Sequence, residues 1–308
     1  MRLLRTPDEC FKELPGWPFS PRYLQVPIAP GSPETARVHY VDEGPPSAPP
    51  VLLMHGEPTW SYLYRHVIPP LTLAGHRVVA VDLVGFGRSD KPALQADYTY
   101  AAHVAWMAHA VFGVLDLRDI TLVCHDWGGL IGLRLVSMAP DRFAGVVAAN
   151  TGLPTGAQAP TEGFLAWRRM ASQAETFQAG SIVAMGTVAH LPDAVRAAYD
   201  APFPDDTYKA GARVFPALVP LSPEDPAAAD QRRAWDVLAG FDKPFLAAFS
   251  DRDPITQGGQ YPFLARIPAA REHIVKGAGH FLQEDTGPQL AEVIKQFIET
   301  KPTRRTTR

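Results

Sequence analysis

The stretch Ile120-Thr-Leu-Val-Cys-His-Asp-Trp-Gly-Gly-Leu-Ile-Gly-Leu133 places the pentapeptide HDWGG, residues 125–129, between two apolar runs. Its first run is short enough for a buried strand and its second opens a buried helix. A strand that turns directly into a helix needs small residues because the turn is strained, and Gly128 and Gly129 supply them. The stretch therefore predicts a nucleophile elbow with Asp126 in the nucleophile position, although an aspartate there could also simply cap the helix.

Short apolar runs recur along the chain with helix-length segments between them. They cover residues 51–54, 78–81, 120–124, 146–149, 245–248 and 273–275. Because their apolarity is continuous rather than alternating, these strands are expected to be covered on both faces, as in a parallel sheet with helical crossovers. An alternating stretch at 37–41 predicts an antiparallel leader strand. The predicted fold class is α/β, with a mostly parallel, doubly wound sheet.

The alternation of predicted strands and helices stops between about residues 151 and 222. Helical segments are predicted there at 162–178 and 192–199, without a clear strand, and Pro- and Gly-rich segments lie on both sides. We interpret residues 152–222 as an inserted helical cap domain. The remainder, 1–151 and 223–308, is then one core domain.

Composition narrows the possible partners of the chain. Its 308 residues include 46% hydrophobic residues, and 29 basic against 32 acidic side chains leave a net charge of −3, which does not favour nucleic acid as a partner. The N-terminal text has no apolar signal region and no stretch is long enough to span a bilayer, so we expect a cytoplasmic protein with no membrane partner. Cys10 and Cys124 are too few for a disulfide framework and have no metal-ligand spacing, so no metal is expected.

A nucleophile elbow in such a fold predicts an acid and then a histidine, each just after a later strand. Both are present: FSDRDP (249–254) follows one predicted strand and GAGHF (277–281) follows the next. The histidine is His280. The acid is Asp251 or Asp253, and Asp253 is favoured because it precedes a proline, as in the related pattern G-x-x-D-P.

A second turn, His55-Gly-Glu57-Pro, follows the predicted strand at 51–54. This is where the fold places the second donor of an oxyanion hole. The backbone N–H groups of Glu57 and Trp127 are therefore expected to stabilise negative charge on an oxygen.

An aspartate nucleophile restricts the chemistry. A serine attacking a saturated carbon would form an ether, which water does not readily cleave, whereas a carboxylate forms an ester, which it does. The carboxylate is ionised at neutral pH, so the histidine is left to activate water afterwards. Haloalkanes and epoxides are the two substrate classes that fit.

Six segments resemble haloalkane dehalogenases of the α/β-hydrolase superfamily, and together they cover most of the chain. They are HGEPTWSYLYR (55–65), VDLVGFGRSDKP (81–92), DLRDITLVCHDWGG (116–129), EGFLAW (162–167), APFPDDTYKAG (201–211) and GAGHFLQE (277–284). The similarity is closest to the subfamily typified by the dichloroethane-degrading enzyme, and it implies an α/β-hydrolase fold.

By matching positions, the resemblance implies Asp126 as nucleophile, His280 as base and Asp253 as its orienting acid. It also implies that Trp127 and Trp167 donate their indole N–H groups to the leaving halide. A sister subfamily has asparagine after the His-Gly turn and an acid after the strand preceding the cap. This chain has Glu57 at the first position and no carboxylate at 150–154, in agreement with the two-tryptophan arrangement.

The expected reaction converts a small haloalkane into a primary alcohol, a halide ion and a proton, without a cofactor. Expected pocket walls are Phe164, Phe215, Pro216 and Val219, and the expected form is a monomer. The alternative is an epoxide hydrolase, with the cap residues Tyr199 and Tyr208 protonating the epoxide oxygen. A ligand receptor that has lost hydrolysis is the rival of a different class.

Overall fold

A central sheet of eight strands organises the computed structural model, which describes residues 1–300. Its order is β10-β9-β8-β7-β4-β5-β3-β2, and the first six of these pair in parallel. Their bounds are β2 (Arg22–Pro27), β3 (Thr35–Glu43), β4 (Pro50–Met54), β5 (Arg77–Val81), β7 (Ile120–His125), β8 (Phe143–Ala149), β9 (Phe245–Ser250) and β10 (Ala270–Val275). A separate ribbon pairs β1 (Leu3–Leu4) with β6 (Lys91–Pro92). The predicted α/β class is confirmed, while the last eight residues of the predicted core domain lie outside the described part.

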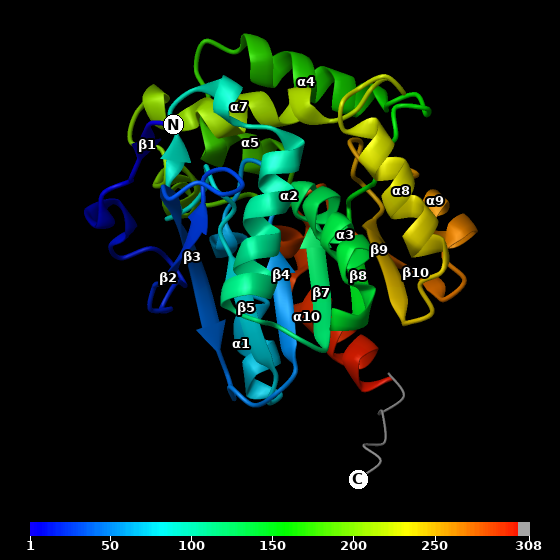
Figure 1. Cartoon of the computed structure of the whole chain (residues 1–308). Helices are drawn as coiled ribbons and strands as arrows, with labels where there is room; N and C mark the ends of the chain where they lie inside the picture. The colour runs from blue at the N-terminus through cyan, green and yellow to red at the C-terminus, as the bar shows by residue number, and fades with distance from the viewer. Residues whose placement is uncertain (301–308) are drawn as a thin grey trace.

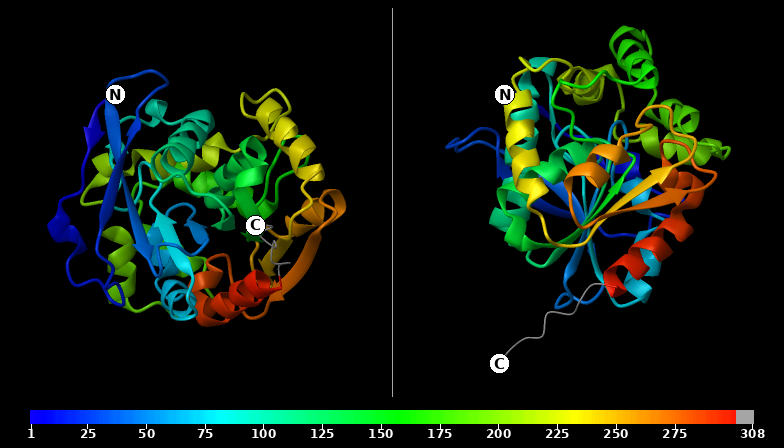
Figure 2. Two further views of the ribbon diagram at one scale, coloured as in Figure 1. Left: turned by 60° about the horizontal axis from the view of Figure 1, so that its bottom comes forward. Right: turned by 90° about the vertical axis from the view of Figure 1, so that its right-hand side faces the viewer.

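Helices cover both faces of this sheet (Figures 1 and 2). Their bounds are α1 (Ile68–Leu73), α2 (Tyr100–Ala108), α3 (Trp127–Met138), α4 (Glu162–Gln173), α5 (Ala179–Met185), α6 (Asp193–Asp200), α7 (Ala210–Val214), α8 (Ala228–Ala239), α9 (Gln260–Arg266) and α10 (Leu282–Glu299). Helices α2, α3 and α8 lie together on one face, and α1 and α10 lie together on the other. Over residues 1–300, every helix is too short or too polar to span a bilayer.

Neighbouring residues of the central strands contribute to two different cores. Leu122 of β7 is buried in the core that includes α2 and α3, while the next residue, Val123, is buried in the core that includes α1 and α10. Side chains alternate between the two faces of a strand, so a sheet covered on both faces buries every position. Each large apolar side chain buried in this way contributes about 1.5–3 kcal/mol. This explains the continuous apolar runs of the sequence.

The predicted leader strand is confirmed as β3, which pairs antiparallel with β5. Its other neighbour, the edge strand β2, was not predicted. Only Leu24 and Val26 of β2 are buried, and the strand ends in a proline. Too few apolar positions remain there to produce a recognisable alternation.

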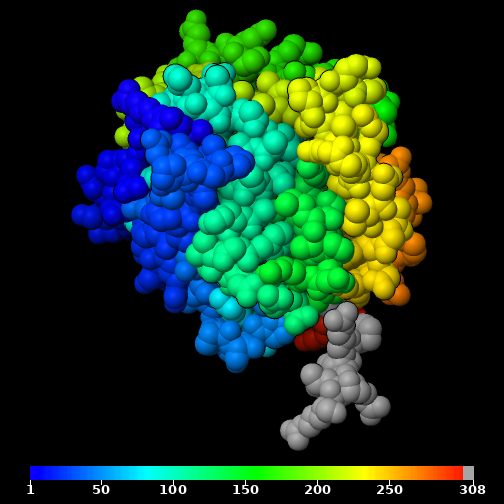
Figure 3. Space-filling view, viewed as in Figure 1, coloured from blue at the N-terminus to red at the C-terminus, as the bar shows by residue number. Residues whose placement is uncertain are grey.

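Four helices, α4 to α7, follow β8 and lie above the sheet in Figure 1, and in space-filling form they close the top of the molecule (Figure 3). The predicted helix at 192–199 is confirmed as α6. The predicted helix at 162–178 is wrong at its end, because α4 stops at Gln173 and the backbone of Ala174 is extended. This break lets Phe177 turn inward, where it is buried near the ring of Trp167.

Candidate active site

Asp126 occupies the sharp turn between β7 and α3, as the elbow prediction requires. Its backbone has φ 49° and ψ −124°, a strained conformation outside the regions that residues other than glycine usually adopt. A Cβ atom at Gly128 would lie 2.1 Å from the carbonyl oxygen of Met54, so β4 leaves room there for glycine alone. At Gly56, a Cβ would lie 2.3 Å from Oδ1 of Asp126. Glycine at both positions therefore leaves room for the turn and for the Asp126 carboxylate at the end of the sheet.

Asp126, His280 and Asp253 come together from the ends of three strands, β7, β10 and β9. Nε2 of His280 lies 3.6 Å from Oδ2 of Asp126, and its Nδ1 lies 2.9 Å from Oδ2 of Asp253. The competing acid, Asp251, accepts instead from the backbone N–H of Gly277 at 2.8 Å. The structure therefore brings Asp253, and not Asp251, to the ring of His280.

The Asp253 carboxylate is held by a local turn as well as by His280. It accepts the backbone N–H of Ile255 at 2.8 Å and both the N–H and the hydroxyl of Thr256. Burial acts to raise the pKa of Asp253, but the histidine and these donors outweigh it and lower the pKa to about 2. Sequence reasoning missed Thr256, although a threonine three residues after an aspartate is typical of a turn in which the carboxylate binds the backbone ahead of it.

The resting site favours a charged histidine between two charged carboxylates. Burial acts to lower the pKa of His280, but Asp253 and Asp126 outweigh it and raise the pKa to about 10. Burial likewise acts to raise the pKa of Asp126, and the hydrogen bond and charge of His280 more than compensate, so this pKa is lowered. Asp126 is therefore ionised without the help of a neutral base.

Two backbone N–H groups point at the Asp126 carboxylate. The N–H of Glu57 donates to its Oδ1 at 2.8 Å, and the N–H of Trp127 also stabilises it. The Glu57 side chain is 4% exposed, and its Oε1 has no hydrogen-bond partner within residues 1–300. Burial, reinforced by the charge of Asp126, raises the pKa of Glu57 well above its ordinary value, which favours the uncharged acid beside the nucleophile.

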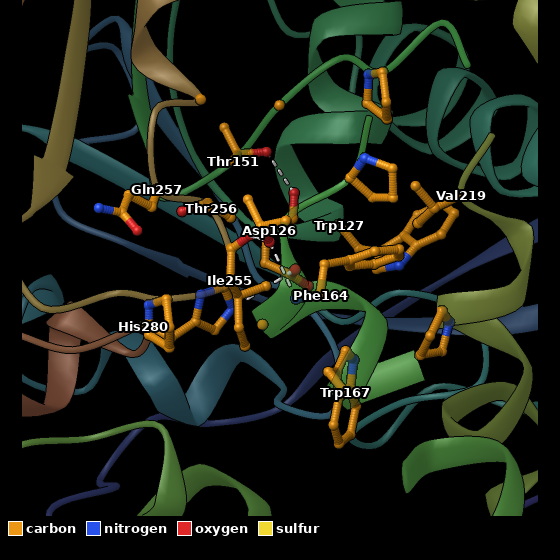
Figure 4. A pocket seen from close by; sticks show the side chains of 18 of the residues that line it. Asp126, Trp127, Thr151, Phe164, Trp167, Val219, Ile255, Thr256, Gln257 and His280 are labelled. Carbon is orange, nitrogen blue, oxygen red and sulfur yellow. Dashed lines mark hydrogen bonds and ion pairs between the residues drawn. The ribbon is translucent and has the colours of Figure 1, made fainter. Parts of the chain in front are cut away.

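A cavity of about 690 Å³ opens above Asp126 (Figure 4). It is lined by the predicted wall residues Phe164, Pro216 and Val219. The prediction for Phe215 is wrong: this side chain lies behind Trp127, with ring centroids 4.5 Å apart, and is fully buried. Phe215 and Pro216 share one turn of the 3-10 helix η7 (Phe215–Leu218), so the two side chains point in different directions.

Trp127 and Trp167 both line this cavity, Trp127 from the start of α3 and Trp167 from α4 (Figure 4). Three buried indole N–H groups donate to a backbone carbonyl: that of Trp60 to Ala198 at 3.0 Å, that of Trp106 to Ile28 at 3.2 Å and that of Trp235 to Leu153 at 2.8 Å. Within the described residues, the indole N–H groups of Trp127 and Trp167 have no such acceptor. Two donors in an apolar setting are thus available to an anion in the cavity.

The two cap tyrosines of the epoxide hydrolase alternative do not line the cavity. Tyr199 is fully buried, and its hydroxyl donates to the carboxylate of Glu284. Tyr208 lies partly buried against the core. Neither hydroxyl is placed to protonate an oxygen bound above Asp126.

Asn150, directly after β8, binds the backbone that carries the histidine, and sequence reasoning gave it no such role. Its amide Nδ2 donates to the carbonyl oxygens of Gly279 at 3.0 Å and His280 at 2.9 Å. The signal was a buried polar residue directly after an apolar strand, at the edge where the carboxyl ends of parallel strands meet. Its partners, however, lie about 130 positions away in the sequence.

The chain is similar in sequence and in fold to known proteins. Residues 49–286 match the family model for the alpha/beta hydrolase fold. The chain is 53% identical to a haloalkane dehalogenase of Psychrobacter cryohalolentis, over 98% of this chain and 100% of that relative. It is 51% identical to a haloalkane dehalogenase of Mycobacterium marinum, over 96% of this chain and 99% of that relative. Among solved structures, the tetrameric haloalkane dehalogenase DpaA from Paraglaciecola agarilytica superposes with a TM-score of 0.88 at 35% identity, over 95% of this chain and 97% of that one.

Proposed function

Because this chain belongs to the haloalkane dehalogenase family of α/β-hydrolases, we propose that it hydrolyses haloalkanes to a primary alcohol, a halide ion and a proton through a covalent ester on Asp126. One observation carries the proposal: an ionised Asp126 faces an apolar cavity with His280 beside it and Asp253 behind the histidine. The site residues belong to one chain, so one chain is the proposed active unit, although the solved relative DpaA is described as tetrameric. A place in the cytoplasm remains a prediction from the sequence.

In the first step, an oxygen of Asp126 attacks the halogen-bearing carbon from the side opposite the halogen. The new C–O bond forms an alkyl ester as the C–halogen bond breaks, and the electron pair of that bond leaves with the halide. Trp127 and Trp167 donate their indole N–H groups to the halide, which corresponds to the two-tryptophan subfamily. Donors already in place cost little reorganisation when the charge appears.

In the second step, water attacks the ester carbonyl and His280 takes its proton. The backbone N–H groups of Glu57 and Trp127 then hold the oxyanion, since the Glu57 N–H already contacts an oxygen of this carboxyl group. Collapse of the tetrahedral intermediate breaks the bond to the alkyl oxygen. The leaving alkoxide takes the proton of the hydroxyl that water added, so the alcohol departs and the Asp126 carboxylate is restored beside a protonated His280.

The charge of His280 changes between the two steps, as this mechanism requires. In the resting site two carboxylates raise the pKa of His280 to about 10. Alkylation removes the charge of Asp126, so only one of the two carboxylates still raises the pKa of His280, and that pKa falls. The histidine then gives its proton to solvent, which is the proton among the products, and only in this neutral form does it act as a base.

The assignment of the cap helices rests on their contribution to the cavity. We propose residues 152–222 as the cap and residues 1–151 with 223–308 as the core. Phe164 and Trp167 of α4 and Ile182 of α5 line the cavity from the cap side, and Asp126 and His280 line it from the core side. This division supports two separate roles: the cap selects the substrate, and the core carries the catalytic residues.

A halide-release assay tests the proposed function directly. We expect halide release from 1-bromobutane, and also from a longer haloalkane such as 1-bromohexane, because cavities of several hundred Å³ hold molecules larger than 1,2-dichloroethane. We expect no diol from styrene oxide, since no tyrosine among residues 1–300 lines the cavity. Diol formation without halide release would favour the epoxide hydrolase alternative, and no turnover of any compound would favour the receptor.

Halide binding tests the role of Trp167. A hydrogen bond to a charged group contributes about 1.5–3 kcal/mol, so Trp167→Phe should weaken bromide binding about tenfold or more. Bromide titration of the tryptophan fluorescence measures this, with Trp127 and Trp235 as the remaining tryptophans that line the cavity. Trp17→Phe is the matched control, because Trp17 packs against Phe19 and Trp60 and does not line the cavity. Equal affinity in the Trp167 variant and the wild type would remove Trp167 from the halide site.

A further inference from the structure

The carboxylate of Asp285 links the histidine-bearing segment 277–281, here called the base loop, to the cap. Asp285 lies in the first turn of α10, just beyond the base loop. Its Oδ2 accepts the backbone N–H of Gly279 at 2.8 Å. Its Oδ1 accepts the N–H groups of Val188 at 2.9 Å and Ala189 at 2.7 Å. One side chain thus joins the residue next to His280 to the segment between α5 and α6.

This segment of the cap, residues 186–189, is called the cap loop below, and it also touches the base loop directly. The backbone N–H of Phe281 donates to the carbonyl oxygen of Gly186 at 3.2 Å. A Cβ atom at Gly279 would lie 2.4 Å from the same carbonyl oxygen. The two loops are therefore in backbone contact, and Asp285 lies at the end of that contact.

Both loops form part of the cavity wall. Gly186, Thr187 and Val188 of the cap loop line it, as do Gly279 and His280 of the base loop. Val188 lines the cavity and is also 46% exposed to solvent. Movement of the cap loop would therefore change the cavity opening and, through Asp285, pull on the backbone beside His280.

The core holds the opposite side of the base loop. Asn150 and Ser250 bind the carbonyl oxygen of Gly279 at 3.0 and 2.7 Å, and His125 lies 2.8 Å from that of His280. Those contacts hold carbonyl groups, whereas Asp285 supplies the acceptor for the Gly279 N–H. Without Asp285, the base loop keeps its core contacts but loses its side-chain link to the cap.

We propose that Asp285 is a positioning residue that couples the cap loop to the base loop and thereby keeps His280 in place for ester hydrolysis. The inference rests on the proposed two-step mechanism, in which His280 acts as a base only in the second step. Loss of Asp285 should therefore slow hydrolysis of the ester and leave its formation unchanged. A general loss of folded protein would instead lower the fraction of chains that form the ester and leave the ratio of the two rates unchanged.

Single-turnover kinetics with 1-bromobutane separate the two steps, because intact-protein mass spectrometry follows the ester as it forms and decays. In Asp285→Ala we expect hydrolysis to slow about tenfold or more, since misplacement of a catalytic group by about 1 Å can cost about a hundredfold. Alkylation should stay within about a factor of two. Asp285→Asn keeps one acceptor oxygen and should give an intermediate hydrolysis rate, and it carries the test if the alanine variant does not fold.

Tyr199→Phe is the matched control, because it loosens the same boundary between cap and core without touching the base loop. The Tyr199 hydroxyl donates to Glu284, which stays paired with Arg65 at 2.7 Å when the hydroxyl is removed. We expect this variant to keep the wild-type ratio of the two rates. An equal change of that ratio in Tyr199→Phe and Asp285→Ala, or an unchanged ratio in Asp285→Ala, would overturn the proposal. If no ester forms even in His280→Gln, the two-step mechanism itself fails, which is a separate result.

Discussion

In a His280→Gln variant exposed to 1-bromobutane, we expect one butyl group to remain on Asp126. Attack by Asp126 needs only an ionised carboxylate and an approaching carbon, so alkylation proceeds without the histidine. Hydrolysis needs a base to take the proton from water, and glutamine has no basic nitrogen. The enzyme should stop after a single turnover, with halide released once per chain.

Mass spectrometry of the intact variant, followed by peptide mapping, locates the adduct. His273→Gln is the matched control, because His273 lies exposed on β10, outside the cavity, and the chemical change is the same. This control should release halide continuously and carry no adduct. A His280 variant that turns over many times, or that carries its butyl group on another residue, would refute the scheme.

Replacement of Asp126 with asparagine should abolish turnover, with a loss in kcat of about 10⁴-fold or more, as expected when a nucleophile is removed. Asparagine has nearly the same shape and also tolerates positive φ, so the elbow at φ 49° should persist. The amide oxygen is a far weaker nucleophile than a carboxylate. The variant should therefore bind substrate and release no halide.

Halide release and intact mass check this second prediction together, because neither free halide nor an alkylated protein should appear. Asp251→Asn is the control, since Asp251 also follows a strand but binds the Gly277 backbone rather than His280. It should keep turnover close to that of the wild type. Rapid halide release by Asp126→Asn would show that another group attacks the carbon.

Much of the fold and the order of the site residues could be predicted because both depend on local patterns. A strand covered on both faces must be apolar at most positions, and this marked β4, β5, β7, β8 and β9. The edge strand β10, which is exposed at residues 271–273, was marked only by its apolar end. The carboxyl ends of parallel strands meet at one edge, so polar residues just after β7, β9 and β10 had to come near one another. Asp126 and His280 follow from that rule.

Other features depend on contacts between distant segments, which no local pattern encodes. The choice of Asp253 over Asp251 depends on which carboxylate the loop turns toward His280, and Thr256 helps to set that direction. Phe215 was predicted as a wall, but packing against Trp127 turned it into the core. The cap adds a further difficulty, because its helices have no sheet to give them a common register.

The sequence by itself therefore determined the α/β sheet, the elbow and the chain order of Asp126, an acid and His280, because strand periodicity and turn chemistry are properties of neighbouring residues. Only the tertiary structure decided which acid contacts the histidine, which aromatic residues face the cavity and how Asp285 joins the cap loop to the base loop. These outcomes depend on packing and hydrogen bonds between segments far apart in the chain, and their geometry exists only once the chain has folded.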